Sequence, residues 1–436
     1  MNNKKTYTSA MFDKDRWQEI FNAIKKNKLR SILTAFGVLW AILMLVVMTG
    51  AGNGLKNGVY EGVKDFATNS GFVWADNTTV AYAGFNRGRH WQINNDDINA
   101  IKDQVPEVEV ISPRLNGWNL RSGENIVRGK RSAAFNVMGD YPSYRDIDPC
   151  TMPYGRYIND EDIKLKRKVC IIGEKVYEVM FDEGEDPVGE YLRVNGVYFM
   201  VVGVFKSNNP QINIGSNKKE TVYLPFTAMQ QTFNYGDQVH YFGLIAKKGV
   251  KVEAVINKIK PILQNNHKLS PEDDEAIGQF NLENQIKTMN FIFLGIDILI
   301  WVVGIGTLIA GAVGISNIML VIVKERTKEI GIQRAIGARP AIIISQLLTE
   351  SVFLTTIAGF IGLALGTIIL YVVDMAVDAS RAGSTGEEET FFLNPEVGLP
   401  LAIAALSMLI IVGLIAGLIP ALKAIKIKPI EALRHE

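Results

Sequence analysis

The sequence contains few of the residues and motifs from which catalytic or metal sites are built. Its 436 residues include two cysteines and four histidines, His90, His240, His267 and His435, which are so scattered that each is expected at the surface and no metal site is predicted. No G-x-x-x-x-G-K-[ST] segment is present, which excludes nucleotide binding by a P-loop. The H-E-x-x-H, C-x-x-C and G-x-S-x-G motifs are missing as well, so nothing in the sequence resembles an active site.

A strong net charge is absent too, whereas long apolar segments are abundant. The net charge of +1 gives no indication of a nucleic-acid partner. Apolar residues make up 48% of the chain and are concentrated in four segments without any charged side chain, residues 31–55, 299–323, 351–373 and 397–422. Each exceeds the roughly 20 residues that a helix needs to cross a bilayer. We therefore predict a membrane protein with four transmembrane helices.

The first apolar segment is predicted to be a retained anchor rather than a cleaved signal peptide. It follows a long polar stretch and exceeds the about 7–15 residues of a signal-peptide hydrophobic region. Within the polar stretch, Trp17, Ile20, Phe21 and Ile24 recur at helical spacing between charged residues, which predicts an amphipathic helix. We expect this helix to lie along the inner membrane surface, and packing on another protein domain is the alternative.

The charges beside the spans predict the orientation of the chain. Basic residues precede span one and follow span four, and five more lie between spans two and three: Lys324, Arg326, Lys328, Arg334 and Arg339. Between spans three and four, by contrast, acidic residues outnumber a single Arg381. Because cytoplasmic loops carry an excess of lysine and arginine, both termini and residues 324–340 are predicted in the cytoplasm, and residues 56–287 outside.

The large segment between spans one and two is predicted to be a mixed α+β domain. Alternating apolar residues on both sides of Asn195-Gly196 indicate a β-hairpin. The segment "VCIIG" followed by "EKVYEVMF" indicates a buried strand and then a helix. Residues 96–113 are expected to form a helix, a break at Pro106 and a strand, and residues 250–267 another helix.

Both cysteines lie in this domain, where an oxidising compartment would permit a disulfide. Cys170 lies within an apolar run and is expected to point into the core. Cys150 follows Asp148-Pro149 and is expected in a loop. The sequence leaves open whether the two cysteines pair.

Small residues recur every four positions in three of the spans. They are Gly306, Ala310 and Gly314 on span two, Ala358, Gly362 and Gly366 on span three, and Gly413 and Gly417 on span four. Small residues at this spacing let helix backbones approach closely in a membrane, so a tightly packed bundle is predicted.

Span two and the span edges carry further signals. The helical pattern of span two begins near Leu282, which gives roughly 60 Å of helix against a hydrocarbon core of about 30 Å. Its first part is therefore expected to project as a stalk, unless the helix kinks near Thr288. Asp297 and Glu350 lie near the ends of spans two and three, and an acidic group inside a membrane is a functional candidate by default.

Residues 324–340, "KERTKEIGIQRAIGARP", form a charged segment between two apolar spans. Ile332, Ala335 and Ile336 make a small apolar stripe within it. Gly337 is placed to end a short helix and Pro340 to begin the next one. A docking surface for a soluble partner is predicted, and a solvated turn with basic anchors is the alternative.

Several long segments resemble the permease subunits of MacB/FtsX-type ABC transporters. They are "NKLRSILTAFGVLWAI" at span one, "KERTKEIGIQRAIGARPAIIISQLLTESVFL" around the charged segment and "IPALKAIKIKPIEALR" at the end. The stretch "GRYINDEDIKLKRKVCIIGEKVYEVMF", with "DPVGEYLRVNGVYFMVVGVF" after it, is similar to the extracytoplasmic domain of the MacB branch. Together these segments cover most of the chain, in the order and spacing of the family.

The resemblance implies a multi-pass protein of the cell inner membrane that acts as a homodimer, or as a heterodimer with a related permease. No cofactor is expected on the chain itself, because ATP and magnesium would be bound by separate cytoplasmic ATPase subunits. A periplasmic adaptor protein is a further candidate partner. In this family the loop after span two contacts the ATPase, which assigns coupling to Lys324, Glu325, Arg326, Lys328, Glu329, Ile332, Arg334 and Ile336.

The family's macrolide exporter has its ATPase fused to the N-terminus, and this sequence lacks that domain, so the ATPase is expected from another polypeptide. Efflux by mechanotransmission is the favoured function, in which ATPase closure moves the outer domain. Lipoprotein release and regulation of cell-wall hydrolases are the alternatives. The expected organisation is an interfacial helix (1–30), span one (31–55), the α+β domain (56–287), span two with its stalk (288–323), a coupling segment (324–340), span three (341–373), an outer loop (374–396), span four (397–422) and a cytoplasmic tail (423–436).

Overall fold

The computed structural model describes residues 28–120, 123–209, 212–383 and 392–426, which form two compact units. One unit, called the helical unit, contains the described residues up to Gly58 and those from Ile292 onward. The other, called the α+β domain, is Val59–Phe291. The amphipathic helix predicted around Trp17 and the basic tail from Ile427 onward lie outside the described residues.

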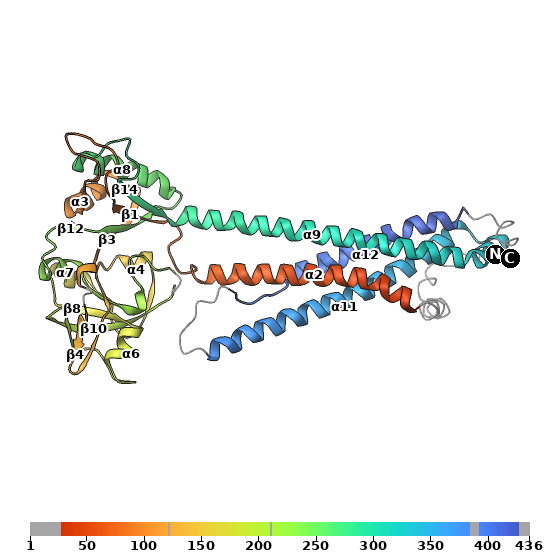
Figure 1. Cartoon of the computed structure of the whole chain (residues 1–436), viewed down its shortest axis with the longest axis horizontal. Coiled ribbons are helices and arrows are strands. Elements are labelled where there is room, and N and C mark those ends of the chain that lie inside the picture. The colour runs from red at the N-terminus through yellow and green to blue at the C-terminus, as the bar shows by residue number, and fades with distance from the viewer. Residues whose placement is uncertain (1–27, 121–122, 210–211, 384–391, 427–436) are drawn as a thin grey trace, which may run out of the picture. The chain divides into compact units, whose positions relative to one another are not determined.

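Four helices in the described residues are long and apolar enough to cross a membrane. They are α2 (Lys28–Glu61), α9 (Leu282–Glu325), α11 (Pro340–Gly383) and α12 (Leu399–Ala424), and the short helix α10 (Thr327–Ala335) follows α9 in the chain (Figure 1). Because the α+β domain lies in the sequence between the first and second of the long helices, the structure confirms the predicted fold class. Side chains from all four helices, such as Ile42, Leu308, Ile343 and Leu409, form the core of the helical unit.

Two of these helices are longer than the predicted spans. α9 includes Thr288 within its 44 residues, roughly 66 Å of helix, so the break considered at that position does not occur. α11 continues to Gly383, so the outer loop predicted from residue 374 was wrong at its start. Asp374 and Asp378 end the apolar run, but no proline or glycine follows until Gly383, and helix propensity therefore carries the helix onward.

The α+β domain contains a twelve-stranded mixed sheet, in the order β14-β1-β13-β3-β6-β11-β8-β10-β9-β4-β5 with β7 paired to β10, and a separate β12-β2 pair. The strands are β1 (Ser70–Ala75), β2 (Ile93–Asn94), β3 (Val108–Asn116), β4 (Ile126–Arg128), β5 (Arg131–Ala133), β6 (Asn136–Asp140), β7 (Cys150–Gly155), β8 (Val169–Gly173), β9 (Tyr191–Val194), β10 (Val197–Ser207), β11 (Thr221–Pro225), β12 (Gln238–Val239), β13 (Tyr241–Ala246) and β14 (Ile277–Asn281).

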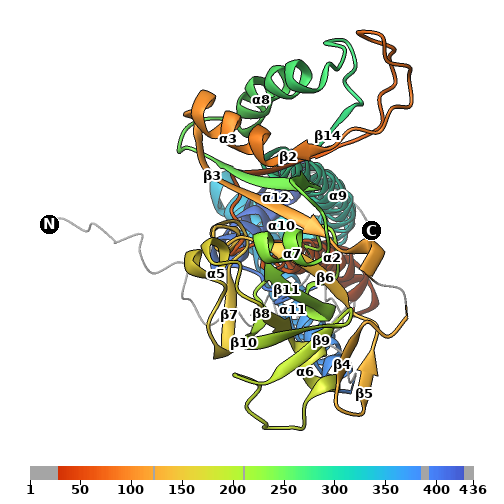
Figure 2. The same ribbon diagram turned by 90° about the vertical axis from the view of Figure 1, so that its left-hand side faces the viewer.

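Short helices cover this sheet. α3 and α8 pack on each other beside β1, β3 and β13 (Figure 2). The helices of the domain are α3 (Asn95–Gln104), α4 (Tyr144–Ile147), α5 (Asp160–Lys164), α6 (Glu174–Met180), α7 (Phe226–Thr232) and α8 (Val252–His267), with 3₁₀ turns η2 (Trp118–Leu120) and η3 (Lys218–Glu220).

Local sequence signals explain several of these elements. The predicted hairpin is β9–β10, in which Asn195 and Gly196 both have positive φ, as a two-residue turn between twisted strands requires. The predicted strand and helix at "VCIIG" and "EKVYEVMF" are β8 and α6. Asn94 and Asp97 form a capping box at the start of α3, which satisfies two backbone donors of that helix end.

Both cysteines are free thiols. Cys170 is fully buried in β8, as predicted. Cys150 is the first residue of β7 and pairs with Ser207, so its predicted place in a loop was wrong. Burial raises the pKa of the Cys150 thiol to about 12, and burial likewise raises the pKa of Cys170, so both thiols are poor nucleophiles near neutral pH.

Candidate functional site

The charged segment predicted as a docking surface folds into the short helix α10. Its C-terminal end is a Schellman motif: Gly337 has a φ of +97°, its N–H donates to the Arg334 carbonyl at 3.1 Å, and the Ala338 N–H donates to the Gln333 carbonyl at 3.0 Å. α11 then begins at Pro340, whose fixed φ suits a first helical position. The chain therefore reverses between α9 and α11 through a helix with a defined end rather than through an irregular loop.

Two arginines fasten α10 to its neighbours in the helical unit. Arg326 Nη1 lies 3.3 Å from Glu350 Oε2 of α11, and the Glu350 side chain is only 3% exposed. Arg334 Nη1 donates to the Ile425 carbonyl at 2.5 Å, immediately after α12. Ile330 is buried in the same core as Val323 and Ile343. α10 is therefore attached to both α11 and the residue that follows α12.

Both arginines, which were predicted to lie on a docking surface, have contacts inside the helical unit. Lys324, Lys328 and Glu329 are exposed instead, and so are the apolar residues Ile332 and Ile336. Ile332 is 42% exposed and Ile336 is 83% exposed, which is unusual for isoleucines outside the apolar helices.

The two carboxylates at span edges have different surroundings. Glu350 is the buried partner of Arg326, so its contact is structural and explains why an acidic group is tolerated there. Asp297 is exposed on α9. The ion pair joins residues 24 positions apart, and the sequence alone did not predict it.

The small residues predicted to pack the spans do so on α11 and α12. Cβ atoms at Gly362 and Gly366 would come within 2.7 Å of Leu39 and Val46 of α2, so these glycines permit a close approach. Gly413 and Gly417 likewise face Thr355 and Ser351 of α11. The Ser351 hydroxyl also donates to the Gly413 carbonyl at 2.8 Å, an interhelical hydrogen bond that requires the backbones to be close.

On α9 the predicted small-residue face was wrong. Cβ atoms built at Gly306 and Gly314 meet nothing within 4 Å, and Ala310 is exposed. Gly304 and Gly311 face α2 instead: a Cβ at Gly304 would lie 2.2 Å from Leu45, and Gly311 lies against Gly37. Gly306 lies two residues after Gly304, which corresponds to a rotation of about 200° around the helix axis. The predicted face is therefore turned away from α2.

The α+β domain contains a buried polar cluster that the sequence did not predict. Arg114 and Asp140, both buried, lie 3.1 Å apart, and the Tyr157 hydroxyl donates to Asp140 at 2.8 Å. Lys218 and Asp148 form a second buried ion pair at 2.5 Å. Each of these charged side chains has an ion-pair partner, so the cluster joins strands and loops of the domain, although Arg114 Nε is buried without a hydrogen-bond partner.

Two histidines expected at the surface are half-buried and hydrogen-bonded. His267 Nε2 lies 2.6 Å from Asp97 Oδ2, and His240 Nδ1 accepts a hydrogen bond from the Asn116 N–H at 2.9 Å. His90 is exposed, as predicted, and His435 lies outside the described residues. Among the described residues, no group of His, Cys, Asp and Glu has the arrangement of a metal site.

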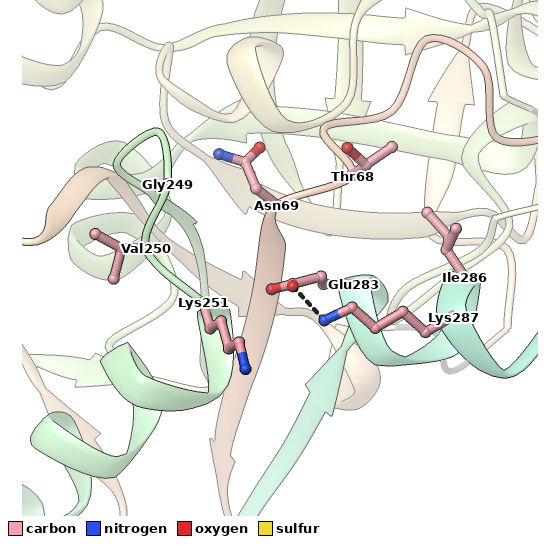
Figure 3. Close-up of a pocket in the computed structure, with 8 residues that line it drawn as sticks. All are labelled: Thr68, Asn69, Gly249, Val250, Lys251, Glu283, Ile286 and Lys287. Atoms are coloured by element: carbon pink, nitrogen blue, oxygen red, sulfur yellow. Dashed lines mark hydrogen bonds and ion pairs between the residues drawn. The ribbon is translucent and has the colours of Figure 1, made fainter.

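A hollow of about 410 Å³ lies where the start of α9 meets the segment before α8 (Figure 3). In its lining, Glu283 Oε1 pairs with Lys287 at 2.5 Å (Figure 3). Glu283 Oε2 accepts the Val252 N–H at 3.0 Å, and Asn69 Nδ2 donates to the Ala246 carbonyl at 2.6 Å. The Glu283–Val252 hydrogen bond thus attaches the start of α9 to the start of α8.

Comparison with known proteins gives two family matches. Residues 31–262 match the MacB-like periplasmic core domain, and residues 301–429 match the FtsX-like permease C-terminal domain. The periplasmic region of MacB from Actinobacillus actinomycetemcomitans aligns with a TM-score of 0.42 and 19% identity, covering 53% of this chain and 97% of that one.

Curated relatives match along nearly the whole chain. The macrolide export ATP-binding/permease protein MacB of Bdellovibrio bacteriovorus is 29% identical over 423 residues, covering 95% of this chain and 61% of that protein. The pyoverdine export ATP-binding/permease protein PvdT of Pseudomonas putida is 28% identical over 420 residues, covering 94% and 58%. The chain thus spans about three fifths of the length of the curated relatives that it matches.

Proposed function

Because this chain belongs to the MacB/FtsX-type family of ABC transporter permeases, we propose that it is the membrane subunit that couples ATP hydrolysis by a partner ATPase to movement of its α+β domain. The observation that carries this proposal is α10. It is a short helix that is fastened to α11 and α12 by Arg326 and Arg334 and still presents two exposed isoleucines. A partner that binds those isoleucines would therefore move the helices behind them.

In the proposed orientation, α10 and both termini are cytoplasmic and the α+β domain lies outside the cytoplasm. The excess of lysine and arginine on the α10 side supports this orientation, as does the acidic loop between α11 and α12. The ATPase would then reach α10 directly.

Transmission from α10 uses the contacts already described. The ATPase closes on ATP and displaces α10, and the Arg326–Glu350 pair and the Arg334–Ile425 hydrogen bond carry the displacement to α11 and α12. α9 runs as one helix from the α+β domain to α10, so it carries the movement to the other side of the membrane. No nucleotide has to bind this chain for the transmission.

The proposed activity is export of an amphipathic small molecule or peptide, by two copies of the permease and two ATPase subunits. The named functions of the relatives, macrolide export and pyoverdine export, support an exporter with a small-molecule substrate. ATP and magnesium would be held by the ATPase.

The test is co-expression of the tagged chain with a candidate ATPase that carries a G-x-x-x-x-G-K-[ST] loop. The purified chain alone is expected to hydrolyse no ATP above background, whereas the purified complex hydrolyses ATP. Replacement of the P-loop lysine in the ATPase should remove the activity of the complex but leave the complex intact. ATP hydrolysis by the isolated chain would contradict the proposal. A failure of the two proteins to copurify, whatever the sequence of α10, would also contradict it.

A further inference from the structure

The α+β domain contains a second and larger cavity, of about 900 Å³, which is at the upper end of the size range of small-molecule sites. It lies entirely within Val59–Phe291. Its walls come from Val63, β1, residues 90–92, the end of β3 with η2, the 212–215 loop, residues 239–241 of β12 and β13, β14 and the first two turns of α9. None of the residues discussed for α10 contributes to it.

The lining of this cavity contains none of the charged side chains Asp, Glu, Lys and Arg. None of its 22 lining residues is of these types, although they make up 21% of the chain. An anion bound there would lose its hydration without gaining a countercharge. The lining therefore favours an uncharged ligand over an anion.

Aromatic rings dominate the lining. All three tryptophans of the α+β domain, Trp74, Trp91 and Trp118, line the cavity, together with Phe280 and Tyr241. Tryptophans contribute large, flat contact surfaces that stack on other rings. The lining therefore favours a flat aromatic ligand over a purely aliphatic one.

Trp118 and His240 form a stacked pair at the cavity. Their ring centroids are 5.6 Å apart and the planes differ by 7°. The Asn116 N–H donates to His240 Nδ1, which places the ring proton on Nε2, and burial lowers the pKa of His240, so the ring is neutral at pH 7. Trp118 remains 68% exposed, which leaves much of its indole surface available to a ligand.

Hydrogen bonds hold the cavity wall in place without a ligand. The Tyr241 hydroxyl donates to the Ile214 carbonyl at 3.1 Å, and Asn116 Nδ2 donates to the Gly215 carbonyl at 3.0 Å. Gly215 has a φ of +87°, and a Cβ there would lie 2.8 Å from the Tyr241 oxygen, so this close approach requires glycine. A preformed wall reduces the ordering cost of binding.

From these observations we propose that the cavity binds an uncharged, flat aromatic molecule of drug size. Leu282, Gln285 and Met289 of α9 line the cavity, and the other end of α9 leads to α10, so bound ligand touches the helix that links the domain to the coupling site. This proposal adds the class of substrate to the proposed function. It rests on that function only in that the bound molecule is taken to be the exported one.

The test uses protection of an introduced cysteine in the full chain, reconstituted in lipid nanodiscs without any ATPase. Gln285→Cys places a thiol at the cavity, and Asn284→Cys places one on the preceding residue of α9, which is also exposed but does not line the cavity. Of the two native thiols, Cys170 is buried and Cys150 is half-buried, and both have a raised pKa, so they react slowly. The probe is Nile red, a flat, uncharged four-ring dye, and the readout is the rate of maleimide labelling.

Nile red is expected to slow the labelling of Gln285→Cys saturably, by about tenfold at ten times its Kd, since about a tenth of the sites are then free. Labelling of Asn284→Cys should be unchanged. Adding Trp118→Ala should raise the Kd about tenfold at an unchanged Tm, and Trp118→Phe should restore most of the affinity. Equal slowing at both positions, or no slowing at Gln285→Cys up to the solubility limit of the dye, overturns the proposal. Because no ATPase is present, either result leaves ATPase docking at α10 to be judged by its own assay.

Discussion

Replacement of both Ile332 and Ile336 by aspartate is expected to release the partner ATPase while the permease stays folded. Both side chains lie on the outer face of α10, and neither belongs to the buried core that contains Ile330. The Schellman motif at Gly337 and the contacts of Arg326 and Arg334 involve other atoms. The double substitution therefore removes a docking surface and leaves the attachments of α10 in place.

The size of the effect follows from the exposed surface of the two isoleucines. Ile332 is 42% exposed and Ile336 is 83% exposed, so together they offer slightly more than one whole side chain for burial. Complete burial of an isoleucine contributes about 1.5–3 kcal/mol, so docking these two contributes about 2–4 kcal/mol. At 1.4 kcal/mol per tenfold, their loss weakens the Kd about 30- to 700-fold. The aspartates add the cost of desolvating two carboxylates, which moves the effect toward the upper end.

The assay is titration of the ATPase onto immobilised permease in detergent, with thermal unfolding of each variant as the folding control. The matched substitution is Leu165→Asp in the α+β domain, because Leu165 is 59% exposed and lies far from α10 in the sequence. Leu165→Asp should leave the Kd unchanged. An Ile332→Asp/Ile336→Asp variant that binds the ATPase as tightly as the wild type would refute the assignment of α10 as the docking helix.

Three further outcomes are expected. In intact spheroplasts, Lys130→Cys should react with a membrane-impermeant maleimide and Lys328→Cys should not, and labelling of Lys328→Cys from outside would reverse the proposed orientation. Arg326→Ala leaves Glu350 buried without its partner and should lower the free energy of unfolding by about 3 kcal/mol. This is the lower end for such pairs because Arg326 is partly exposed. In thermal unfolding, Arg326→Lys should retain part of the stability that Arg326→Ala loses. Burial alone would raise the pKa of Asp97, but hydrogen bonds from His267, Asn266 and the Asn94 backbone outweigh it and hold the pKa low. The stability that ionised Asp97 contributes is therefore fully present above its unfolded-state pKa of about 3.9 and is lost as the pH falls through the lower folded-state pKa. The Tm difference between the wild type and Asp97→Asn should therefore shrink in acid.

The features that could be predicted from the sequence are those with local causes. Asn195-Gly196 determines a hairpin because both residues accept positive φ, and Gly337 ends α10 for the same conformational reason. The membrane helices follow from uninterrupted apolar runs. In each case the residues that produce the structure are neighbours in the chain.

The features that could not be predicted depend on partners far apart in the chain. Arg114 pairs with Asp140, which is 26 residues later, and Arg334 donates to the Ile425 carbonyl, which is 91 residues later. No short sequence pattern therefore reveals either contact. The choice of Gly304 over Gly306 depends on how α9 is rotated toward α2, which spacing alone does not determine. The aromatic cavity is likewise assembled from seven separate segments, and its tryptophans are far apart in the sequence.

The continuity of α9 makes this helix a lever. It contains no proline, and four of its five glycines, Gly304, Gly306, Gly311 and Gly314, fall within eleven consecutive residues. Glycine lowers helix stability by about 1 kcal/mol relative to alanine, so bending is easiest in that segment. The arm from Leu282 to Gly304 is about 33 Å long, and a bend of about 5° at the glycines would move its far end by about 3 Å. A displacement of that size is comparable to the thickness of an aromatic ring.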